Sequence, residues 1–292
     1  MEPETVGPTA LVRVPWPADS RLSRGGFNPR AFLHAPDTPK IDITPRWARL
    51  LGAFVGDGSC GQSTQIQISC DGQDQDWIDL LMEDFAAVGL NPTTETITTY
   101  GGEVLRRRGV RVASAHLLRV LESFGMTRPR PNGRPIRVAN VHEVIWRSPR
   151  EVIAEFLAAY LEADGHCTHT GVGAVSKDER LIHDVQRLLL LFGIETRIGC
   201  RIYRAQNGFE GLYWQLTMRR AAADVFAKEI GFRSTRKSKR LAEIVSRPNS
   251  NAYRPMAWAQ EIVSIEHCTV DPVDLQVEGE VFAAAGFVSH SF

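Results

Sequence analysis

One short phrase occurs twice in this chain, and the repetition limits the folds open to it. Residues 50–60 read LLGAFVGDGSC, and residues 156–167 read FLAAYLEADGHC. Each phrase is apolar and rich in small residues for about two turns, then ends in Asp-Gly with a Cys two residues later. Asp57 and Asp164 are 107 residues apart, and Cys60 and Cys167 have the same separation.

Two further landmarks keep almost the same offset. Apolar helical runs close on Gly89 and Gly193, which are 104 residues apart. Later helical segments close on Gly125 and Gly231, which are 106 residues apart. Four landmarks in the same order at a nearly constant offset indicate an internal duplication of about 105 residues.

Hydrophobic periodicity predicts the same order of elements in both copies. In the first copy we expect a helix from Pro45 to about Val55 with Thr44 as N-cap, a strand near 66–68, a helix over 74–88, extended segments over 91–100 and 103–114, and a helix over 114–124. In the second copy we expect a helix over 149–163, a strand over 171–176, a helix over 178–192, strands over 194–204 and 211–219, and a helix over 221–230. Each half is therefore an α+β unit.

Charges are segregated along the chain, although the formal net charge is zero. Residues 101–150 carry eleven Arg against three Glu, and residues 197–240 carry eleven Lys or Arg against three acids. Two basic zones favour a polyanion partner, and paired strands of a curved sheet can enter a DNA major groove. The alternative is that these charges only solvate loops. The candidate DNA-binding residues are Arg106, Arg107, Arg108, Arg111, Arg201, Arg204, Arg219 and Arg220.

Each repeated phrase places an aspartate at the C-terminal end of a helix. A carboxylate there interacts unfavourably with the helix dipole, at a cost of about 0.3–1 kcal/mol, which suggests that the aspartates have a function. The following residues, Gly58 and Gly165, are expected to be C′ stops in the left-handed conformation. An ordinary Asp-Gly turn would explain one copy, but two copies after helices of small residues favour a shared role.

Small residues suggest how the two aspartates could meet. They lie near one face of each helix and let two backbones approach closely. They are Gly52, Ala53 and Gly56 in the first helix and Ala158, Ala159 and Ala163 in the second. If these helices pack side by side, both carboxylates reach one point and repel unless a divalent cation lies between them. Oxygen-only ligands suit Mg²⁺, which beside a basic curved sheet would serve phosphodiester hydrolysis.

The two phrases resemble the LAGLIDADG motif of homing endonucleases. Residues 50–58, LLGAFVGDG, keep the first Leu, the third-place Gly and the final Asp-Gly; residues 157–165, LAAYLEADG, keep Leu-Ala, a sixth-place acid and Ala-Asp-Gly. Val55 replaces the usual sixth-place acid of the first motif. The resemblance spans about 44–245. It implies an α+β, pseudo-two-fold, duplicated αββαββα fold with saddle-shaped antiparallel sheets in a single chain.

The resemblance also implies an activity and a site. It implies a Mg²⁺-dependent double-strand DNA endonuclease that acts on a long, weakly palindromic target as a monomer. Asp57 and Asp164 would bind the metal, with the preceding Gly56 and Ala163 counted in the metal site. Mn²⁺ is expected to replace Mg²⁺, and Ca²⁺ is expected to support binding without cleavage.

Family members often carry a basic residue, commonly Lys, late in each repeat near the metal-bound water. The second copy offers Lys237 and Lys239, and the comparable place in the first copy is Arg134. Arginine keeps its proton and cannot act as a base, so the two strands are expected to be cut at unequal rates. The alternative is that these residues only contact phosphates.

Residues 273–290, VDLQVEGEVFAAAGFVSH, resemble the C-terminal splicing blocks of an intein. Asp274 opens the block that reads roughly Asp-Leu-x-Val-Glu-Gly, and His290 matches the closing run. Ser291 stands where the cyclising Asn is usual, and the chain starts Met-Glu-Pro rather than with Cys or Ser. We therefore expect a small, β-rich, Hint-like remnant that cannot splice by itself. The alternative is an unrelated β tail.

The remaining features bound the organisation of the chain. We divide it into an irregular N-terminal segment (1–43), the first repeat (44–140), the second repeat (141–250) and the intein-like remnant (258–292). Five cysteines without a CxxC pair predict neither a disulfide framework nor a zinc ribbon. No signal or membrane-spanning stretch is evident, so we expect a cytoplasmic protein of a bacterial or phage-infected cell. Two alternatives remain open, a non-cleaving DNA-binding protein on the same fold and the C-terminal piece of an intein.

Overall fold

The computed structural model describes residues 13–15, 40–61, 64–97, 107–129, 135–169, 171–204, 210–218, 220–247, 281–284 and 287–290. The chain divides into two compact units, Met1–Arg247 and Pro248–Phe292, and each is described by itself. The division falls ten residues before the start predicted for the C-terminal remnant.

The first unit contains the duplication, and both copies have the order αββαββα. The first repeat consists of α1 (Pro45–Asp57), β3 (Gly58–Cys60), β4 (Gln65–Asp71), α2 (Gln75–Ala87), β5 (Thr93–Ile97), β6 (Arg107–Ala113) and α3 (Ala115–Ser123). The second repeat consists of α5 (Arg150–Ala163), β9 (Gly165–Thr168), β10 (Gly171–Ser176), α6 (Glu179–Leu190), β11 (Thr196–Arg204), β12 (Glu210–Met218) and α7 (Arg220–Glu229). The predicted duplicated α+β fold is confirmed.

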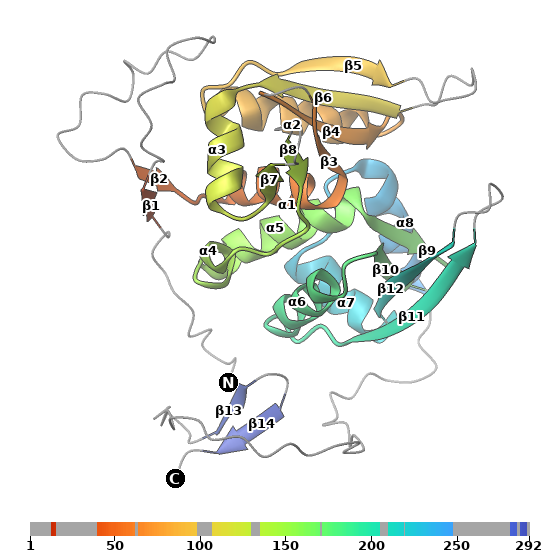
Figure 1. Ribbon diagram of the computed structural model, residues 1–292. Coiled ribbons are helices and arrows are strands. Elements are labelled where there is room, and N and C mark those ends of the chain that lie inside the picture. Colours follow the sequence, from red (N-terminus) through yellow and green to blue (C-terminus); the bar gives the residue numbers. More distant parts are fainter. Residues whose placement is uncertain are drawn as a thin grey trace. The chain divides into compact units, whose positions relative to one another are not determined.

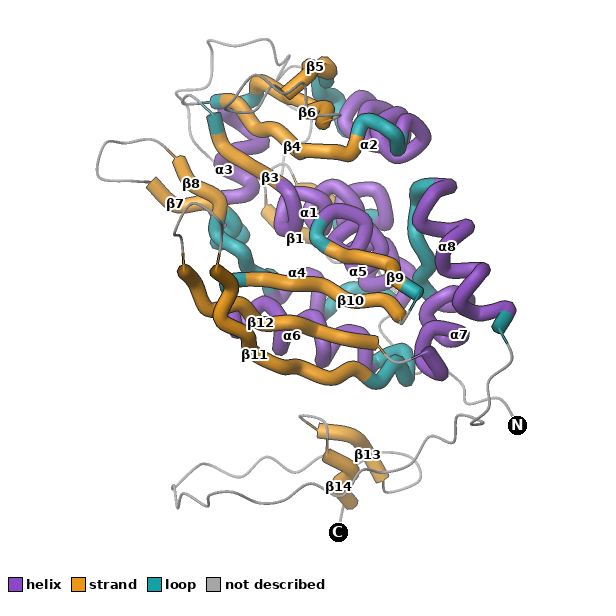
Figure 2. The backbone as a smooth tube through the Cα atoms, turned by 90° about the vertical axis from the view of Figure 1, so that its right-hand side faces the viewer, coloured by secondary structure: helices purple, strands orange, loops and turns teal. Residues whose placement is uncertain are grey.

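The two sheets have the same topology (Figure 2). The first has the strand order β3-β4-β6-β5, and the second has the equivalent order β9-β10-β12-β11. All neighbouring strands within these sheets are antiparallel. Alternate residues of β4, such as Ile66 and Ile68, are buried against the helices, and the residues between them lie on the opposite, open face.

Helices α1 and α5 lie side by side at the centre of the unit, with the rest of each repeat on opposite sides (Figure 1). Their backbones approach closely because small residues meet there. A Cβ atom added at Gly52 would lie 2.2 Å from the carbonyl oxygen of Phe156, and one at Gly56 would lie 2.6 Å from the Cβ of Ala163. The close helix pairing predicted from the small residues is thereby confirmed.

The motif helices end at the glycines after the two aspartates, as predicted, but these glycines are not in the left-handed conformation. Gly58 has φ −72° and ψ 148°, which is extended backbone, and the φ of Gly165 is not positive either. The chain passes straight from each motif helix into β3 or β9. A Cβ atom at Gly58 would lie 2.3 Å from the carbonyl oxygen of Phe54, and one at Gly165 would lie 2.2 Å from that of Leu161. Glycine is required there by the close approach of a helix carbonyl.

Each repeat has additions that break the symmetry and were not expected. The first repeat is followed by the paired strands β7 (Thr127–Pro129) and β8 (Pro135–Arg137) and by the short helix α4 (Glu143–Trp146). The second repeat is followed by the helix α8 (Thr235–Ser246), which Ser234 caps by accepting a hydrogen bond from the amide of Lys237. These additions reach the ends of the motif helices.

The flanks are described only in part. Strand β1 (Arg13–Pro15) pairs with β2 (Lys40–Asp42) before the first repeat. In the second unit β13 (Val281–Ala284) pairs with β14 (Phe287–His290), and His290 lies opposite Val281. Asp274 lies outside the described residues, so the intein-like remnant stays a prediction. Among the helices of the described residues, none is long and apolar enough to cross a membrane.

Candidate active site

The ends of the two motif helices adjoin one another. Asp57 is the last residue of α1, and Asp164 caps the C-terminus of α5. A Cβ atom at Gly56 would lie 3.3 Å from the backbone nitrogen of Asp164. The two aspartates predicted to act together are therefore brought to one place by the glycine–alanine contact between their helices.

The environment of Asp164 is unfavourable for its negative charge. Burial, with the nearby charge of Asp57, raises the pKa of the Asp164 carboxyl to about 7, although Arg137 and Lys237 act to lower it. Two neighbouring carboxylates that are partly buried and repel each other are the donor set that a divalent cation stabilises. The described residues contain no group of three or more His, Cys, Asp or Glu side chains placed to hold a metal. Two carboxylates would hold a hard divalent ion such as Mg²⁺ together with oxygen ligands from water or substrate.

Lys237, one of the two predicted lysines, reaches the site from the first turn of α8. Its ammonium donates hydrogen bonds to the carbonyl oxygens of Leu161 (3.3 Å), Glu162 and Gly165 (2.9 Å), around the end of α5. Burial lowers the pKa of Lys237, while Glu162 acts to raise it. Lys239 is exposed on the same helix and does not line the site.

Arg137 holds the corresponding place in the first repeat, and the sequence pattern did not indicate it. From the end of β8 its guanidinium donates to the carbonyl oxygens of Val55 and Gly56. Val55 and Glu162 are equivalent positions of the two motifs, so Arg137 and Lys237 bind the same turn of their respective helices. The predicted residue, Arg134, lies outside the described residues. The duplication offset did not find Arg137 because a strand here replaces the helix of the second repeat.

The sixth-place acid of the second motif, Glu162, is a structural anchor. It is buried, with 4% of its surface exposed, and accepts hydrogen bonds from the amide and hydroxyl of Ser234 and from the amide of Arg233. Its carboxylate also lies 3.8 Å from the ammonium of Lys237. Val55 at the equivalent position is buried among apolar residues. The difference between the motifs therefore follows from the presence of α8 in one repeat.

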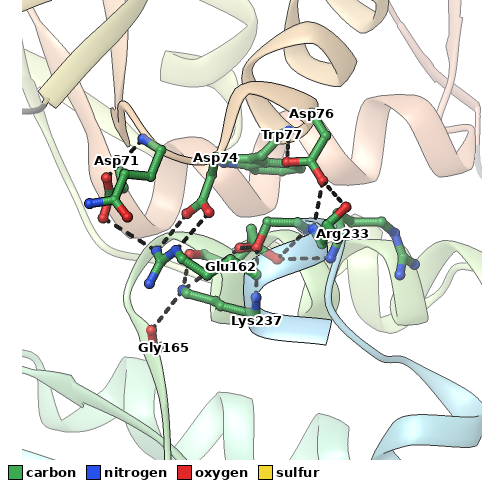
Figure 3. A network of polar contacts seen from close by, with 12 residues as sticks. Asp71, Asp74, Asp76, Trp77, Glu162, Gly165, Arg233 and Lys237 are labelled. Atoms are coloured by element: carbon green, nitrogen blue, oxygen red, sulfur yellow. Dashed lines mark hydrogen bonds and ion pairs between the residues drawn. The ribbon is translucent and has the colours of Figure 1, made fainter. Parts of the chain in front are cut away.

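A pocket of about 480 Å³ is lined by Asp57 and by Ala163 and Gly165, the two neighbours of Asp164 in the chain. It lies between the turn from β4 to α2 in the first repeat and the residues of α5, β9 and α8 in the second (Figure 3). Its lining combines acids with bases. The charged residues and histidine among them are Asp57, Asp71, Asp74, Glu162, His166, Arg236, Lys237 and Arg240.

Strand register sorts the predicted DNA-binding arginines of the first sheet between its two faces. Arg111 lies opposite Gln67 and Thr93 on the open face, where it forms an ion pair with Glu95. Arg108 lies on the helix side, and its guanidinium donates to the Gln75 side chain of α2 at 3.1 Å. Arg106 lies outside the described residues, and so does the side chain of Arg107.

In the second sheet the same alternation separates Arg201 from Arg204. Arg201 lies opposite Tyr213 on the open face, on the side away from the buried Leu216. Arg204 lies on the helix side and forms an ion pair with Glu210 across the hairpin. The predicted Arg220 is not on a strand.

Two further basic residues of the second repeat share the open face with Arg201. Arg197 lies opposite Thr217, and the ammonium of Lys177 lies 5.4 Å from the ring centroid of Tyr213. Arg220 instead begins α7 and donates to the carbonyl of Ile244 in α8 at 3.1 Å, so it holds two helices together. Arg219 lies outside the described residues.

Comparisons with known proteins found a family model and several relatives that are similar to this chain. A model of the LAGLIDADG-like domain matches residues 151–231. The A subunit of DNA gyrase from Mycobacterium gordonae is 28% identical over 228 residues, which are 73% of this chain and 38% of that protein. A probable translation initiation factor IF-2 of Thermococcus kodakarensis is 26% identical over 165 residues, which are 56% of this chain and 13% of that protein. The chain thus spans well under half the length of these curated relatives.

Among solved structures, I-DmoI in complex with DNA and Mn is similar, with a TM-score of 0.45 and 16% identity, over 65% of this chain and 97% of that one. The match to the family model covers most of the second repeat and includes Asp164. Residues 151–231 are thus similar to the LAGLIDADG-like domain, and the α+β architecture of this chain, with its antiparallel sheets, is the one that the resemblance predicted.

Proposed function

We propose that this protein is a site-specific DNA endonuclease that uses a divalent cation, Mg²⁺ in particular, to hydrolyse one phosphodiester bond in each strand. The observation that carries the proposal is the meeting of Asp57 and Asp164 at the ends of two packed helices, in an environment that raises the pKa of Asp164 to about 7. If no cation bound between Asp57 and Asp164, replacing these carboxylates with neutral side chains would stabilise the protein.

The open faces of the two sheets support a role in DNA binding. Arg111 lies on the open face of the first sheet. Arg197, Arg201 and Lys177 lie on that of the second, beside two tyrosines that offer flat apolar contacts. Basic side chains on paired strands can contact phosphates and base edges in a major groove. Two such faces joined by a pseudo-two-fold arrangement match a long target whose half-sites are only partly alike, bound by one monomer.

The side chains at the motif ends suggest how hydrolysis is divided between the repeats. A divalent cation held by Asp57 and Asp164 would stabilise charge on the phosphate and make a bound water more acidic. Lys237 and Arg137 lie beside the carboxylates and place positive charge where the phosphate oxygens become more negative. Burial lowers the pKa of Lys237 and so eases loss of its proton, whereas Arg137 keeps its proton throughout.

The relatives favour an origin within a larger protein. Overlapping parts of this chain are similar to parts of a DNA gyrase subunit and of a translation initiation factor, which are different proteins. A mobile element inserted into different host genes would give such a pattern. We therefore propose that the chain descends from an intein and that residues 258–292 are the remnant of its splicing domain. The tail resembles the C-terminal splicing blocks but lacks their final Asn.

The test works without a known target sequence. Purified protein is incubated with genomic DNA of its source and with a randomised plasmid library, in Mg²⁺ and separately in Ca²⁺, and the DNA ends are sequenced. We expect Mg²⁺-dependent breaks at one extended DNA sequence. On that site, Asp57→Asn and Asp164→Asn should retain binding in Ca²⁺ and lose cutting by at least about a thousandfold.

Three other outcomes of these experiments would contradict parts of the proposal. Binding to one sequence in Ca²⁺ without breaks in Mg²⁺ would favour the non-cleaving DNA-binding protein. Normal cutting by both aspartate variants would overturn the assignment of the site. A ligated product on mixing with an N-terminal intein fragment would show that the tail still splices.

A further inference from the structure

The first turn of α8 crosses from the second repeat to the first beside the active site (Figure 3). We call residues 233–237, which contain this turn, the strap. On one side the strap is fixed to its own repeat, since Glu162 accepts hydrogen bonds from the amides of Arg233 (2.8 Å) and Ser234 (3.1 Å). On the other side it is fixed to the first repeat by aspartates at the start of α2.

Three acids of the first repeat hold the strap. Asp76 accepts hydrogen bonds from the amide (2.6 Å) and the hydroxyl of Thr235. Asp74, which is 3% exposed, accepts two hydrogen bonds from the guanidinium of Arg236, at 2.8 and 2.6 Å. Asp71 lies 3.3 Å from the same guanidinium. Charge-assisted contacts of this kind, one of them with a buried acid, fix position as well as add stability.

The strap ends on Lys237, which lies at the end of α5 next to Asp164. Lys237 follows Thr235 and Arg236 directly, and its ammonium is held among the carbonyls at the end of α5. The position of this second-repeat lysine is therefore tied to acids of the first repeat as well as to its own repeat. Among the described residues Arg137 has no such link, because its contacts with Val55 and Gly56 stay within the first repeat.

We propose that Asp74 and Asp76 are positioning residues for Lys237, so that docking of the strap on the first repeat controls cutting of one strand only. This inference rests on the proposed nuclease function. The acids do not serve DNA binding, because a carboxylate repels phosphate. Their loss should leave affinity unchanged or raised, and should slow the strand that Lys237 serves.

The first experiment needs no DNA. The full chain and its Asp74→Asn and Asp76→Ala variants are treated briefly with an amine-acetylating reagent, and modification of Lys237 is compared with that of Lys239 by mass spectrometry. Lys239 is exposed on the same helix and serves as the internal reference. We expect Lys237 to be protected in the parent protein and to approach the reactivity of Lys239 in the variants. Equal protection in all three proteins would overturn the proposal.

The second experiment follows the two strands of the target separately. The Lys237 strand is identified as the one that a Lys237→Met variant slows more. Asp74→Asn and Asp76→Ala should slow that strand by about tenfold to a hundredfold, the range for groups that orient a catalytic neighbour, and leave the other strand within about twofold. Nicked DNA should therefore accumulate.

A matched control separates this effect from a general loss of structure. Asp79 lies on α2, as Asp76 does, and accepts a hydrogen bond from the side chain of Gln75 in the same helix at 2.7 Å. Asp79→Ala should therefore change neither the labelling of Lys237 nor the ratio of the two strand-cutting rates. Equal slowing of both strands in Asp74→Asn and Asp76→Ala would contradict the proposal. Failure of the parent protein to cut would instead count against the nuclease function, and the labelling result would still decide whether the strap holds Lys237.

Discussion

Arg137 and Lys237 occupy equivalent places at the ends of the two motif helices, although one extends from a strand and the other from a helix. Each donates hydrogen bonds to the carbonyl oxygen of the sixth motif residue, Val55 or Glu162. The two halves of the candidate active site therefore place a positive charge at equivalent points, but the charged group is a guanidinium in the first repeat and an ammonium in the second.

This asymmetry predicts unequal cutting of the two strands. Only Lys237 can lose a proton, so we expect the parent protein to pass through a nicked intermediate with one strand cut first. Lys237→Met should reduce cutting of its strand by about a hundredfold, within the usual range for a group that transfers or stabilises a proton. Arg137→Lys should bring the two rates closer. Strand-specific end-labelling measures both. Equal rates in the parent protein would contradict the prediction.

The raised pKa of Asp164 predicts that its ionised carboxylate destabilises the folded protein in the absence of metal. The folded protein holds this proton up to about pH 7, whereas the ordinary value is 3.8. The stability gained from protonation is therefore complete below pH 3.8 and is lost as the pH rises through 7. Without metal, Asp164→Asn should raise the unfolding temperature at pH 8 by a few degrees, from a gain on the order of 1–2 kcal/mol.

Two controls accompany the Asp164→Asn measurement. The gain should shrink as the pH falls from 7 towards 4, because the parent carboxyl is then protonated as well. Addition of Ca²⁺ should stabilise the parent protein more than the variant. An unfolding temperature that differs by the same amount at every pH would show that the effect is unrelated to the charge.

The close contact of α1 and α5 predicts which glycines cannot be replaced. In Gly52→Ala the new methyl would lie 2.2 Å from the carbonyl oxygen of Phe156, so the helices must separate. We expect a loss of about 2–3 kcal/mol in the free energy of unfolding, as for overpacked cores, and loss of cutting because the aspartates move apart. Chemical denaturation measures the loss. Gly199→Ala, where nothing lies within 4 Å, is the control and should be nearly neutral.

The two faces of the second sheet predict different roles for two arginines of one strand. Arg201 lies on the open face, and Arg204 lies on the helix side in an ion pair with Glu210. Arg201→Ala should weaken DNA binding in Ca²⁺ and reduce the salt dependence of binding by about one unit of slope. Arg204→Ala should change neither by much. Equal effects of the two substitutions would mean that the open face is not the DNA-binding face.

The sequence alone predicted the duplication, the order of elements and the two aspartates. These follow from local patterns, since a helix with small residues on one face can pack closely only against another such helix, as Gly56 and Ala163 do. Periodicity, which needs only neighbouring residues, predicted the order of the elements except for the strands β3 and β9 that follow the motif helices. The same local patterns misread Gly58, whose close contact with Phe54 depends on the strand that follows it.

Only the tertiary structure decided which basic residues reach the site. Lys237 and Lys239 are alike in sequence, but capping by Ser234 and the hold of Asp74 and Asp76 turn Lys237 inward and leave Lys239 in solvent. The sequence did not indicate Arg137 because it lies in strand β8, whereas Lys237 lies in helix α8, so the two residues do not align in the duplication. Strand register likewise separated Arg201 from Arg204. Contacts between residues far apart in the chain set these placements, and no local pattern encodes them.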